Sequence, residues 1–547
     1  MLIAKKSSLF IELLCGGLNN LYLKFMKLKH LILFLAAYVA LFFLLFPSYQ
    51  YLIDPDATGY ISVAERLSRG DYFNAINGMW SPLGSWILSP FIKSGFDAVI
   101  TEKYLNGVYG FIILCSFFYL IKKMRISFVI EVGILIAGIT LIVHFVFFRL
   151  FGDLLQAMFL LLYLNVICSK SFYGNYLMIV LAAFLGGLGF YAKVYSFYFT
   201  VAHLVIVLIV FEKKISNKYF NVGVLKKILA GISTLIIIVL PWVFILKHKY
   251  GSLILSCTGA YNMTWSLSAV YPQPRVLFYP PPYSDGYSIW DDPSFWHVTN
   301  ITPFTSSKTF LFQLKLIGSN FLELIKNLNI YSCFLISILL IIFLSLFTKI
   351  REKTNNINNI ILISFLLIWP LGILLLHVEA RFLWIMVMVA LLLGGVILTY
   401  LETRRYFSKK IFLILVFIVI SSFSIYPLKE LKEEVNKGKN ISNMANALKR
   451  NNIGGNLISY HQNSGERDAS VVLNYLLKGK YFGPHENDYT TPEILSGIEE
   501  YKIDNYILFY HSQYQKQQII KGEIARYADS IYVDLYPGIV VLTFRHN

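Results

Sequence analysis

The amino-acid sequence predicts a polytopic α-helical membrane protein that ends in a small α/β domain. Of the 547 residues, 56% are hydrophobic and only 14% are charged, whereas soluble domains carry about 25% charged residues. Long apolar stretches recur as far as Pro427, and each is long enough to cross about 30 Å of hydrocarbon. Beyond Pro427 the pattern changes to the short, periodic segments of a soluble domain.

The apolar stretches predict about eleven transmembrane helices, because a span needs roughly 17 to 25 residues. These segments are 29–49, 102–121, 126–147, 150–168, 176–192, 194–211, 228–246, 330–348, 358–376, 381–401 and 410–427. The fifth and sixth are separated only by the short region around Lys193. The closeness of these two segments leaves the number of spans open by one or two.

The basic residues predict the orientation of the chain in the membrane. The net charge is +17, and basic residues gather in the short connectors at 122–125, 213–227, 349–353 and 404–410. Cytoplasmic loops carry such an excess of Lys and Arg. With the N-terminus in the cytoplasm, alternation of the spans places all four connectors on that side. This pattern excludes nucleic acid as the partner of the positive charge, and the Lys-, Asn- and Ile-rich composition favours a bacterial inner (plasma) membrane.

The same alternation predicts three regions along the chain. Residues 1–27 form a cytoplasmic or interfacial segment, 28–430 a transmembrane domain with external loops at 48–101 and 247–329, and 431–547 an extracytoplasmic α/β domain. The second loop is rich in Pro, Tyr and Trp. It is interpreted either as an irregular segment on the membrane interface or as a functional lid or binding loop. Residues 309–327 predict a helix on the membrane surface.

The C-terminal region predicts alternating helices and strands. Its expected helices are 441–452 and 491–503, its expected strands are 455–461 and 504–510, and a terminal hairpin is expected around Pro537–Gly538. No Gly-rich phosphate loop is present in this region. We therefore expect it to support the protein or to dock an acceptor, with catalysis elsewhere.

Charged residues recur at helix ends on the predicted outer face. They are Asp54 and Asp56 after the first span, Arg149 and Asp153 before the fourth, Lys193 after the fifth, and His377, Glu379 and Arg381 between the ninth and tenth. A charge at the centre of a span costs about 2.5–3.5 kcal/mol, so such residues are candidates for function. Each one alone is often a helix cap or a snorkelling side chain. Their coincidence on one face predicts a reaction site there.

The first external loop carries the clearest motifs. The segments YISVAERLSRGDYF and WSPLGSW follow the two aspartates, and they resemble the GT-C glycosyltransferases of the family 39 type, which include protein O-mannosyltransferases and lipid A aminoarabinose transferases. The positions in register with that family are Asp56, Tyr60, Ala64, Gly70, Asp71, Ser81, Pro82, Leu83 and Trp86. Three positions depart from it: Ala57 replaces the usual Glu, Ser81 replaces a Pro, and Trp80 stands where a lysine is common.

Three further segments match the same family in order along residues 28–430. RLFGDLLQAM supplies Arg149 and Asp153, GLGFYAK supplies Lys193, and EARFLW supplies Glu379 and Arg381. Each segment alone is a weak signal. Together, in sequence order and on one predicted face, they are considerably more specific.

The resemblance implies transfer of a sugar, with inversion, from a polyprenyl-phosphate donor to an extracytoplasmic acceptor. A carboxylate suits the base that takes the proton of the acceptor, and a guanidinium suits the departing phosphate. The implied catalytic residues are Asp56 as base, with Asp54 or Asp153 orienting it or the acceptor. The implied substrate-binding residues are Arg381, Lys193, Arg149, Glu379, His377, Tyr60 and Trp86.

The resemblance implies no cofactor. A divalent cation held by Asp54, Asp56 and Asp153 is an alternative, since hard cations take oxygen ligands, but the resemblance does not favour it. The expected partners are the polyprenyl-phosphate sugar, the acceptor and the lipid bilayer.

Two other classes of protein compete with this interpretation. A lipid or solute transporter would carry internal repeats and broken helices with polar groups near the middle of the membrane, and no repeat between the halves is evident. A cell-envelope glycan ligase or polymerase would place its charged residues in the late external loop, without the acidic first loop. The sequence leaves the sugar and the acceptor open among proteins, lipids, glycans and wall polymers.

Overall fold

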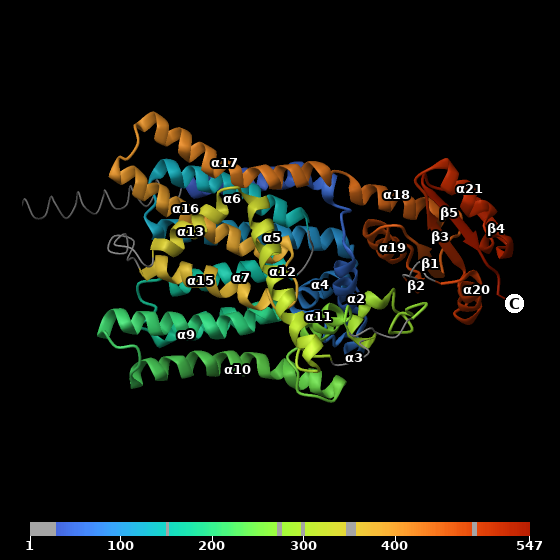
Figure 1. The fold of residues 1–547 in the computed structure, drawn as a ribbon, viewed down its shortest axis with the longest axis horizontal. Coiled ribbons are helices and arrows are strands. Elements are labelled where there is room, and N and C mark those ends of the chain that lie inside the picture. The colour runs from blue at the N-terminus through green and yellow to red at the C-terminus, as the bar shows by residue number, and fades with distance from the viewer. Residues whose placement is uncertain are drawn as a thin grey trace, which may run out of the picture.

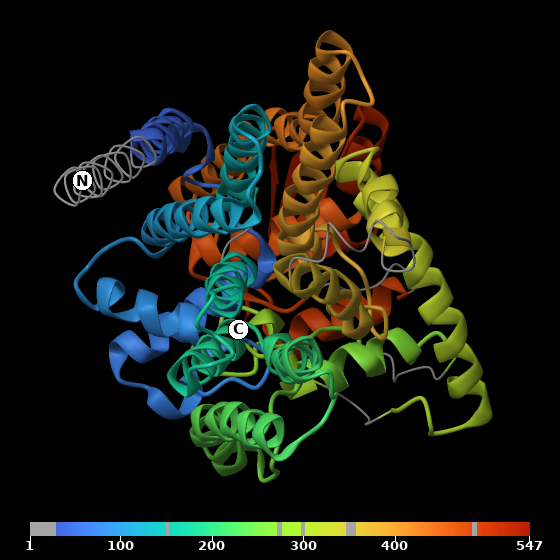
Figure 2. The ribbon, with the colours of Figure 1, turned by 90° about the vertical axis from the view of Figure 1, so that its left-hand side faces the viewer.

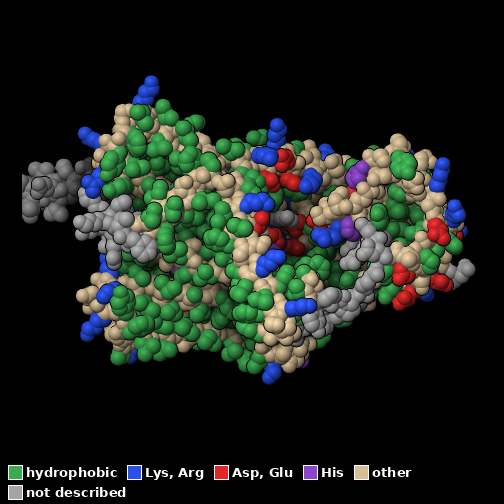
Figure 3. Space-filling view, in the orientation of Figure 1, with side chains coloured by type: hydrophobic (Ala, Val, Ile, Leu, Met, Phe, Trp, Pro, Cys, Tyr) green, Lys and Arg blue, Asp and Glu red, His purple; other side chains and the backbone are tan. Residues whose placement is uncertain are grey.

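The computed structural model describes residues 29–148, 152–270, 276–296, 301–345, 357–483 and 489–546. The helices form an elongated bundle, and the C-terminal domain lies at one end of it (Figure 1). The predicted N-terminal segment 1–27 lies outside the described residues. Hydrophobic side chains cover the face of the bundle seen in Figure 3, as expected where helices meet lipid.

Apolar helices account for each of the eleven predicted spans. The helices of the bundle are Lys29–Tyr49, α5 (Ala98–Met124), α6 (Phe128–Phe148), α7 (Asp153–Ile167), α8 (Tyr176–Ala192), α9 (Tyr195–Ser216), α10 (Val222–Tyr250), α12 (Ser307–Tyr331), α13 (Leu335–Ser345), α15 (Ile357–Ile373), α16 (Trp384–Arg404) and α17 (Lys409–Glu433). Within the described residues, seven helices are long and apolar enough to cross a membrane, or eight if a bent pair is one span. Three shorter apolar helices, α7, α8 and α15, complete the set.

The bent pair is α12 and α13, which meet at an angle of 114°. The sequence predicted a surface helix over 309–327 followed by a span, and the break at Ser332 separates these two parts. Ser306 begins α12 with a capping box that it shares with Thr309, which satisfies free N–H groups of the first turn. In the end view of Figure 2, the yellow helix α12 lies at the outer edge of the molecule.

The bundle is held together by apolar contacts between helices from distant parts of the chain. Helix α6 packs against α5 and α17, α7 against α5 and α8, and α10 against α8 and α9. The predicted end of the last span at Pro427 is wrong, because α17 continues through this proline to Glu433. Tertiary contacts override the local helix-breaking tendency of proline: buried Leu431, beyond the proline, belongs to the core of the bundle.

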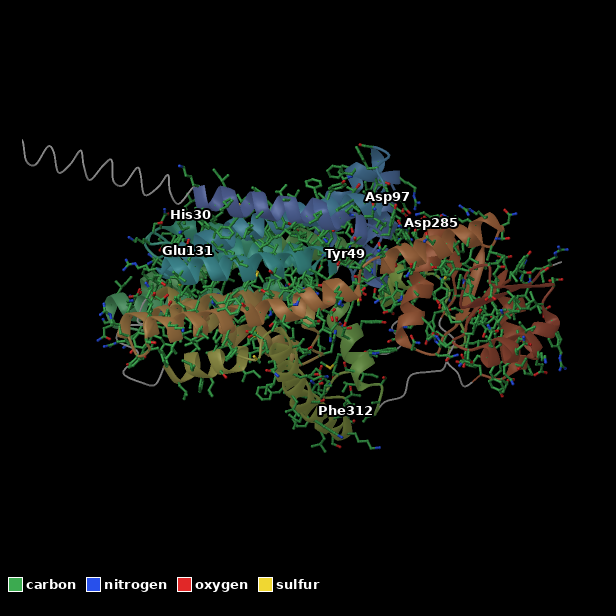
Figure 4. All side chains as sticks on the ribbon, turned by 90° about the horizontal axis from the view of Figure 1, so that it is seen from above. His30, Tyr49, Asp97, Glu131, Asp285 and Phe312 are labelled. Carbon is green, nitrogen blue, oxygen red and sulfur yellow. The ribbon has the colours of Figure 1, made fainter. Side chains whose placement is uncertain are left out.

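The two ends of the bundle differ in character. His30 and Glu131 mark the end far from the C-terminal domain, whereas Tyr49, Asp97 and Asp285 lie toward it (Figure 4). Basic side chains gather at the far end, and acidic side chains gather in a hollow between the bundle and the C-terminal domain (Figure 3). Short helices surround this hollow: α2 (Pro55–Arg69), α3 (Tyr72–Ala75), α4 (Pro82–Lys93), α11 (Thr258–Leu267), η1 (Ile289–Asp291), η2 (Pro293–Trp296) and η3 (Ala380–Leu383).

The C-terminal domain contains a five-stranded mixed sheet of order β2-β1-β3-β5-β4. Its elements are α18 (Lys437–Arg450), β1 (Asn456–Tyr460), α19 (Ser464–Leu477), β2 (Lys480–Tyr481), α20 (Thr491–Glu500), β3 (Asn505–Phe509), α21 (Gln513–Lys521), η4 (Ile524–Tyr527), β4 (Ser530–Val533) and β5 (Ile539–Thr543). Strand β1 pairs in parallel with β2 and β3, and β5 pairs in antiparallel fashion with β3 and β4.

The predicted helices, strands and terminal hairpin of this domain are confirmed, and helices α19 and α21 and strand β2 are additions. The start of α19 could have been found from the sequence, because Asn463 caps it and Glu466 stands at the third helical position, a pattern typical of helix N-termini.

The described part of the Pro-, Tyr- and Trp-rich loop is buried between the bundle and the C-terminal domain. Phe278 packs into the apolar core beside the sheet, and the N–H of Tyr279 donates to the carbonyl of Phe482 at 2.8 Å. The N–H of Tyr481 donates to the carbonyl of Tyr287 at 2.7 Å. Of the two interpretations of this loop, these contacts argue against a segment that only rests on the membrane interface.

Candidate active site

A cavity of about 580 Å³ lies at the end of the bundle that carries α2 and α11. Its lining comes from distant parts of the chain: the start of α2, the start of α7, the junction of α8 and α9, α11, the end of α15, and η3. Charged side chains occupy one part of the wall and apolar side chains most of the rest. The candidate residues of the sequence that line it are Asp56, Tyr60, Asp153, Lys193, His377 and Arg381.

Arg381 is the centre of the charged part of the cavity. Its Nη1 lies 2.8 Å from Asp56 Oδ2 and 3.7 Å from Asp153 Oδ2, and its Nε lies 2.7 Å from Glu379 Oε2. The Arg381 side chain is 15% exposed. One guanidinium therefore joins three carboxylates that are far apart in the sequence, which its fixed fork of donors allows.

Lys193 supplies the second cation of the cavity. It caps the end of α8, directly before Val194 and the start of α9, and it lines the cavity there. Its Nζ forms an ion pair with Asp153 Oδ1 and lies 4.3 Å from the ring centre of Phe382. Asp153 begins α7, where a carboxylate is favoured by the helix dipole.

Asp56 is the carboxylate most directly open to the cavity. Its side chain is 26% exposed, compared with 7% for Asp153. Burial raises the pKa of Asp56, and the charge of Arg381 offsets part of that effect. A carboxylate with a raised pKa is a more effective proton acceptor near neutral pH.

Tyr60 stands one helical turn beyond Asp56. Burial, together with the charges of Asp153 and Asp56, raises the pKa of its hydroxyl, so the phenol stays protonated. Its ring packs against Trp80 at 5.1 Å between ring centres. The first turn of α2 therefore presents both an acid–base group and a hydroxyl donor to the cavity.

Asp54 does not line the cavity. It is the N-cap of α2, where its Oδ1 accepts the N–H of Ala57 at 3.0 Å. Pro55 follows at the first helical position, as is common at helix starts. The Asp54 carboxylate thus fixes the helix that presents Asp56, and its negative charge contributes to the raised pKa of that residue.

His377 and Glu379 lie at the rim beside Arg381. His377 Nε2 and Glu379 Oε1 are 3.1 Å apart. Burial alone would raise the pKa of Glu379, but the hydrogen bond from His377 and the charge of Arg381 outweigh it and hold the pKa below its usual range. Glu379 is therefore ionised and orients the guanidinium.

Among the described residues, two expected ones besides Asp54 do not line the cavity: Glu379 and Trp86. Trp86 packs in an aromatic cluster with Tyr191 and Trp242, at 5.3 and 5.7 Å between ring centres. Arg149 lies outside the described residues. The sequence placed Trp86 near the site through its motif, but α4 turns this side chain toward α8 and α10.

The apolar part of the cavity comes mainly from α9 and α15. Tyr195, Tyr198, Trp369, Ile373 and Leu376 line it. The hydroxyl of Tyr195 donates to the carbonyl of Trp369, and this bond joins the two helices. A ligand with one charged end and one apolar part matches such a cavity.

Sequence reasoning missed the contribution of α11 and of two polar side chains. Thr258, Asn262 and Met263 of α11 line the cavity, together with Trp80 and Gln156. Helix α11 lies in the loop 247–329, is short and contains no charged residue, so no local signal marked it. Among the residues that the structure describes, no group of three or more His, Cys, Asp or Glu side chains could hold a metal ion.

Comparison with known proteins identifies the fold. No family model matches the sequence, and no curated protein matches it. ArnT from Cupriavidus metallidurans in the apo state is similar in structure, with a TM-score of 0.52, 11% identity, and coverage of 94% of this chain and 97% of that chain. The oligosaccharyltransferase AglB from Archaeoglobus fulgidus, in complex with an inhibitory peptide and a dolichol-phosphate, has a TM-score of 0.53, 10% identity, and coverage of 89% and 69%.

These two similarities extend over nearly the whole chain and include the helical bundle. ArnT and AglB are GT-C glycosyltransferases. At such low sequence identity the similarity concerns the fold. The protein is therefore a multi-pass membrane protein with a GT-C-like fold.

Proposed function

We propose that the protein is a membrane glycosyltransferase that moves a sugar from a polyprenyl-phosphate donor to an acceptor at the Asp56–Arg381 cavity. The observation that carries this proposal is the meeting of Arg381 and Lys193 with Asp56 and Asp153 at one end of a largely apolar cavity. Such a site suits a ligand with a phosphate headgroup and a hydrocarbon tail. The fold similarity to AglB, which was solved with a dolichol-phosphate, supports the same class of donor.

The geometry suits an inverting displacement with Asp56 as the base. The nucleophilic group of the acceptor forms a bond to the anomeric carbon while the bond from that carbon to the phosphate oxygen breaks. Asp56 takes the proton of the acceptor, and the electron pair leaves with the phosphate. General-base catalysis of this kind contributes about 10²- to 10⁴-fold.

Arg381 and Lys193 stabilise the departing phosphate. Charge-assisted hydrogen bonds to a phosphate strengthen as negative charge develops on it. In the ligand-free protein both cations are held by carboxylates. A phosphate that engages Arg381 draws its positive charge away from Asp56, so donor binding makes Asp56 a stronger base.

The cavity is proposed to lie at the outer side of the membrane. The basic connectors 122–125, 213–227, 349–353 and 404–410 support this orientation, because Lys- and Arg-rich connectors favour the cytoplasmic side. This orientation places the C-terminal domain and the described part of loop 247–329 outside, beside the acceptor. A bacterial inner membrane with a cytoplasmic N-terminus is part of this proposal.

A transfer assay tests the function. Membranes that contain the protein receive a radiolabelled polyprenyl-phosphate sugar and an extract of envelope lipids, glycans and proteins as acceptors. We expect transfer with the wild-type protein and a loss of about 10²-fold or more with Asp56→Asn and with Arg381→Ala. The matched control is Glu433→Gln, an exposed carboxylate on α17, which should transfer normally. Full activity of Asp56→Asn would refute the proposed base.

A further inference from the structure

The C-terminal half of helix α2 is bound to the C-terminal domain by polar contacts of Glu65. Asp56 stands in its first turn, and Glu65 stands in its C-terminal half. The Glu65 side chain is 14% exposed. It receives the hydroxyl of Tyr287 at 2.8 Å, the hydroxyl of Tyr475 at 3.3 Å and Lys478 Nζ at 3.0 Å.

We name this group of four side chains, Glu65, Tyr287, Tyr475 and Lys478, the α2 junction. It joins three regions: α2 near the cavity, the long external loop through Tyr287, and the C-terminal domain through Tyr475 and Lys478. The two aromatic rings meet edge to face at 5.2 Å. Lys478 Nζ lies 4.2 Å from the ring centre of Tyr475 and 4.9 Å from that of Tyr287.

The backbone of Tyr287 is fixed as firmly as its side chain. Its carbonyl accepts Asn474 Nδ2 and the N–H of Tyr481, each at 2.7 Å. Both donors belong to the C-terminal domain. Tyr287 therefore cannot shift relative to that domain without breaking two hydrogen bonds, and Glu65 is tied to a rigid partner.

A second contact of α2 lies one residue further. Arg66, which is 1% exposed, donates from Nη2 to Asp291 Oδ2 at 2.7 Å, and Asp291 is fully buried. On the same helix, Ile61 and Ala64 share an apolar core with Val472 and Tyr475 of α19. The C-terminal half of α2 is thus enclosed by protein from the loop and from α19.

The start of α2 meets the cavity and α4, where Ser85 Oγ donates to the carbonyl of Tyr60 at 2.8 Å. Asp54 caps the first turn from within the same segment, and the described ion pair of this turn is the one that Asp56 makes with Arg381. Because a helix transmits a shift of one end to the other as a stiff rod, the α2 junction sets where the Asp56 carboxylate lies relative to Arg381.

We infer that Glu65 is a positioning residue for transfer, and that the C-terminal domain acts on the reaction by holding helix α2 through the α2 junction. Glu65 faces away from the cavity and does not line it, so its effect on the reaction passes through the placement of Asp56. This inference rests on the proposed function and assigns to the C-terminal domain a part in it.

The experiment compares Glu65→Ala, Glu65→Gln and Lys478→Met with two matched controls, Glu433→Gln and Lys480→Met. Lys480 is exposed and lies beside Lys478 in sequence, and Glu433 is an exposed carboxylate. The full-length protein in nanodiscs is used throughout. Hydrogen–deuterium exchange of peptides that cover residues 54–64 is measured first, because this readout does not depend on activity.

We expect Glu65→Ala to speed exchange in the 54–64 peptides, Lys478→Met to do so less, and both controls to leave it unchanged. In the transfer assay, Glu65→Ala should lower kcat by about 10- to 100-fold, since small displacements of a catalytic group have effects of this size, with the KM for the donor unchanged. Glu65→Gln keeps acceptors for the two tyrosines and should recover part of kcat. The acid limb of the kcat profile should move in Glu65→Ala, because Asp56 changes its distance to Arg381.

Three results would overturn the inference. One is unchanged exchange of the 54–64 peptides in Glu65→Ala. Another is faster exchange with normal kcat. A third is a fall in kcat that only follows the folded fraction, with the pH profile unmoved. If the wild-type protein transfers no sugar, the proposed function fails, and the exchange data still decide whether the α2 junction holds the helix.

Discussion

Replacement of Arg381 by Gln should move the pH dependence of transfer in a defined direction. Burial raises the pKa of Asp56 and the guanidinium of Arg381 lowers it. Without the guanidinium, burial and the negative charges of Asp54 and Glu379 act unopposed. The pKa of Asp56 therefore rises further. Because a base must be ionised to accept a proton, the acid limb of kcat/KM should move to higher pH.

The size of this movement follows from the geometry. Arg381 Nη1 lies 2.8 Å from Asp56 Oδ2, which places the centres of the two charges about 4 Å apart. At an effective dielectric constant of about 20, two unit charges at this separation interact by about 4 kcal/mol. Removal of this attraction should therefore move the acid limb measurably to higher pH.

The assay is the pH profile of kcat/KM for the polyprenyl-phosphate sugar, since this ratio reports the ionisation of the free enzyme. Lys193→Gln is the control, because it removes a cation that pairs with Asp153 while the contact of Arg381 with Asp56 stays intact. It should lower kcat/KM with a much smaller movement of the acid limb. A uniform loss in Arg381→Gln with an unmoved limb would refute the role of Asp56 as a base held by Arg381.

Three further changes test the surroundings of the site. Arg66→Met leaves the fully buried Asp291 without its cation and should lower the free energy of unfolding by about 3–5 kcal/mol, measured by thermal or denaturant unfolding in detergent; a loss near zero would contradict the ion pair. Gly59→Ala would place its Cβ 2.3 Å from Trp80 Nε1, so we expect α2 to shift and transfer to fall sharply, and normal kinetics would exclude that close contact. Trp86→Ala should keep the transfer rate within about 3-fold of the wild-type rate, since substitutions away from a site have small effects. A loss as large as that of Asp56→Asn would show that Trp86 takes part in substrate binding.

The sequence predicted the charged residues that line the cavity. Asp56, Lys193 and Arg381 are charges at the ends of apolar segments, and such charges stand out without any knowledge of the fold. Their pairing did not follow from the sequence. Asp56 and Arg381 lie 325 residues apart in the sequence, and only the folded arrangement of α2 and η3 places their side chains in contact.

The structure gives neighbouring candidate residues different places. The family register favoured Asp56 over Asp54 as the base, and the structure shows that Asp54 caps α2 while Asp56 lines the cavity. Trp86 matched a motif position and was therefore expected in the site. In the structure, α4 directs its side chain toward Tyr191 and Trp242, away from the cavity lining. No sequence pattern marked Glu65 as a candidate, because its three partners come from the loop and from the end of α19.

The sequence by itself determined the fold class, the number of apolar segments, and two helices, two strands and the terminal hairpin of the C-terminal domain, because apolar runs and local periodicity depend on neighbouring residues. The tertiary structure alone decided which carboxylate meets which cation, which helices line the cavity, and that the C-terminal domain holds helix α2. These features depend on contacts between residues hundreds of positions apart. Such contacts arise from the packing of whole helices, and no local pattern encodes them.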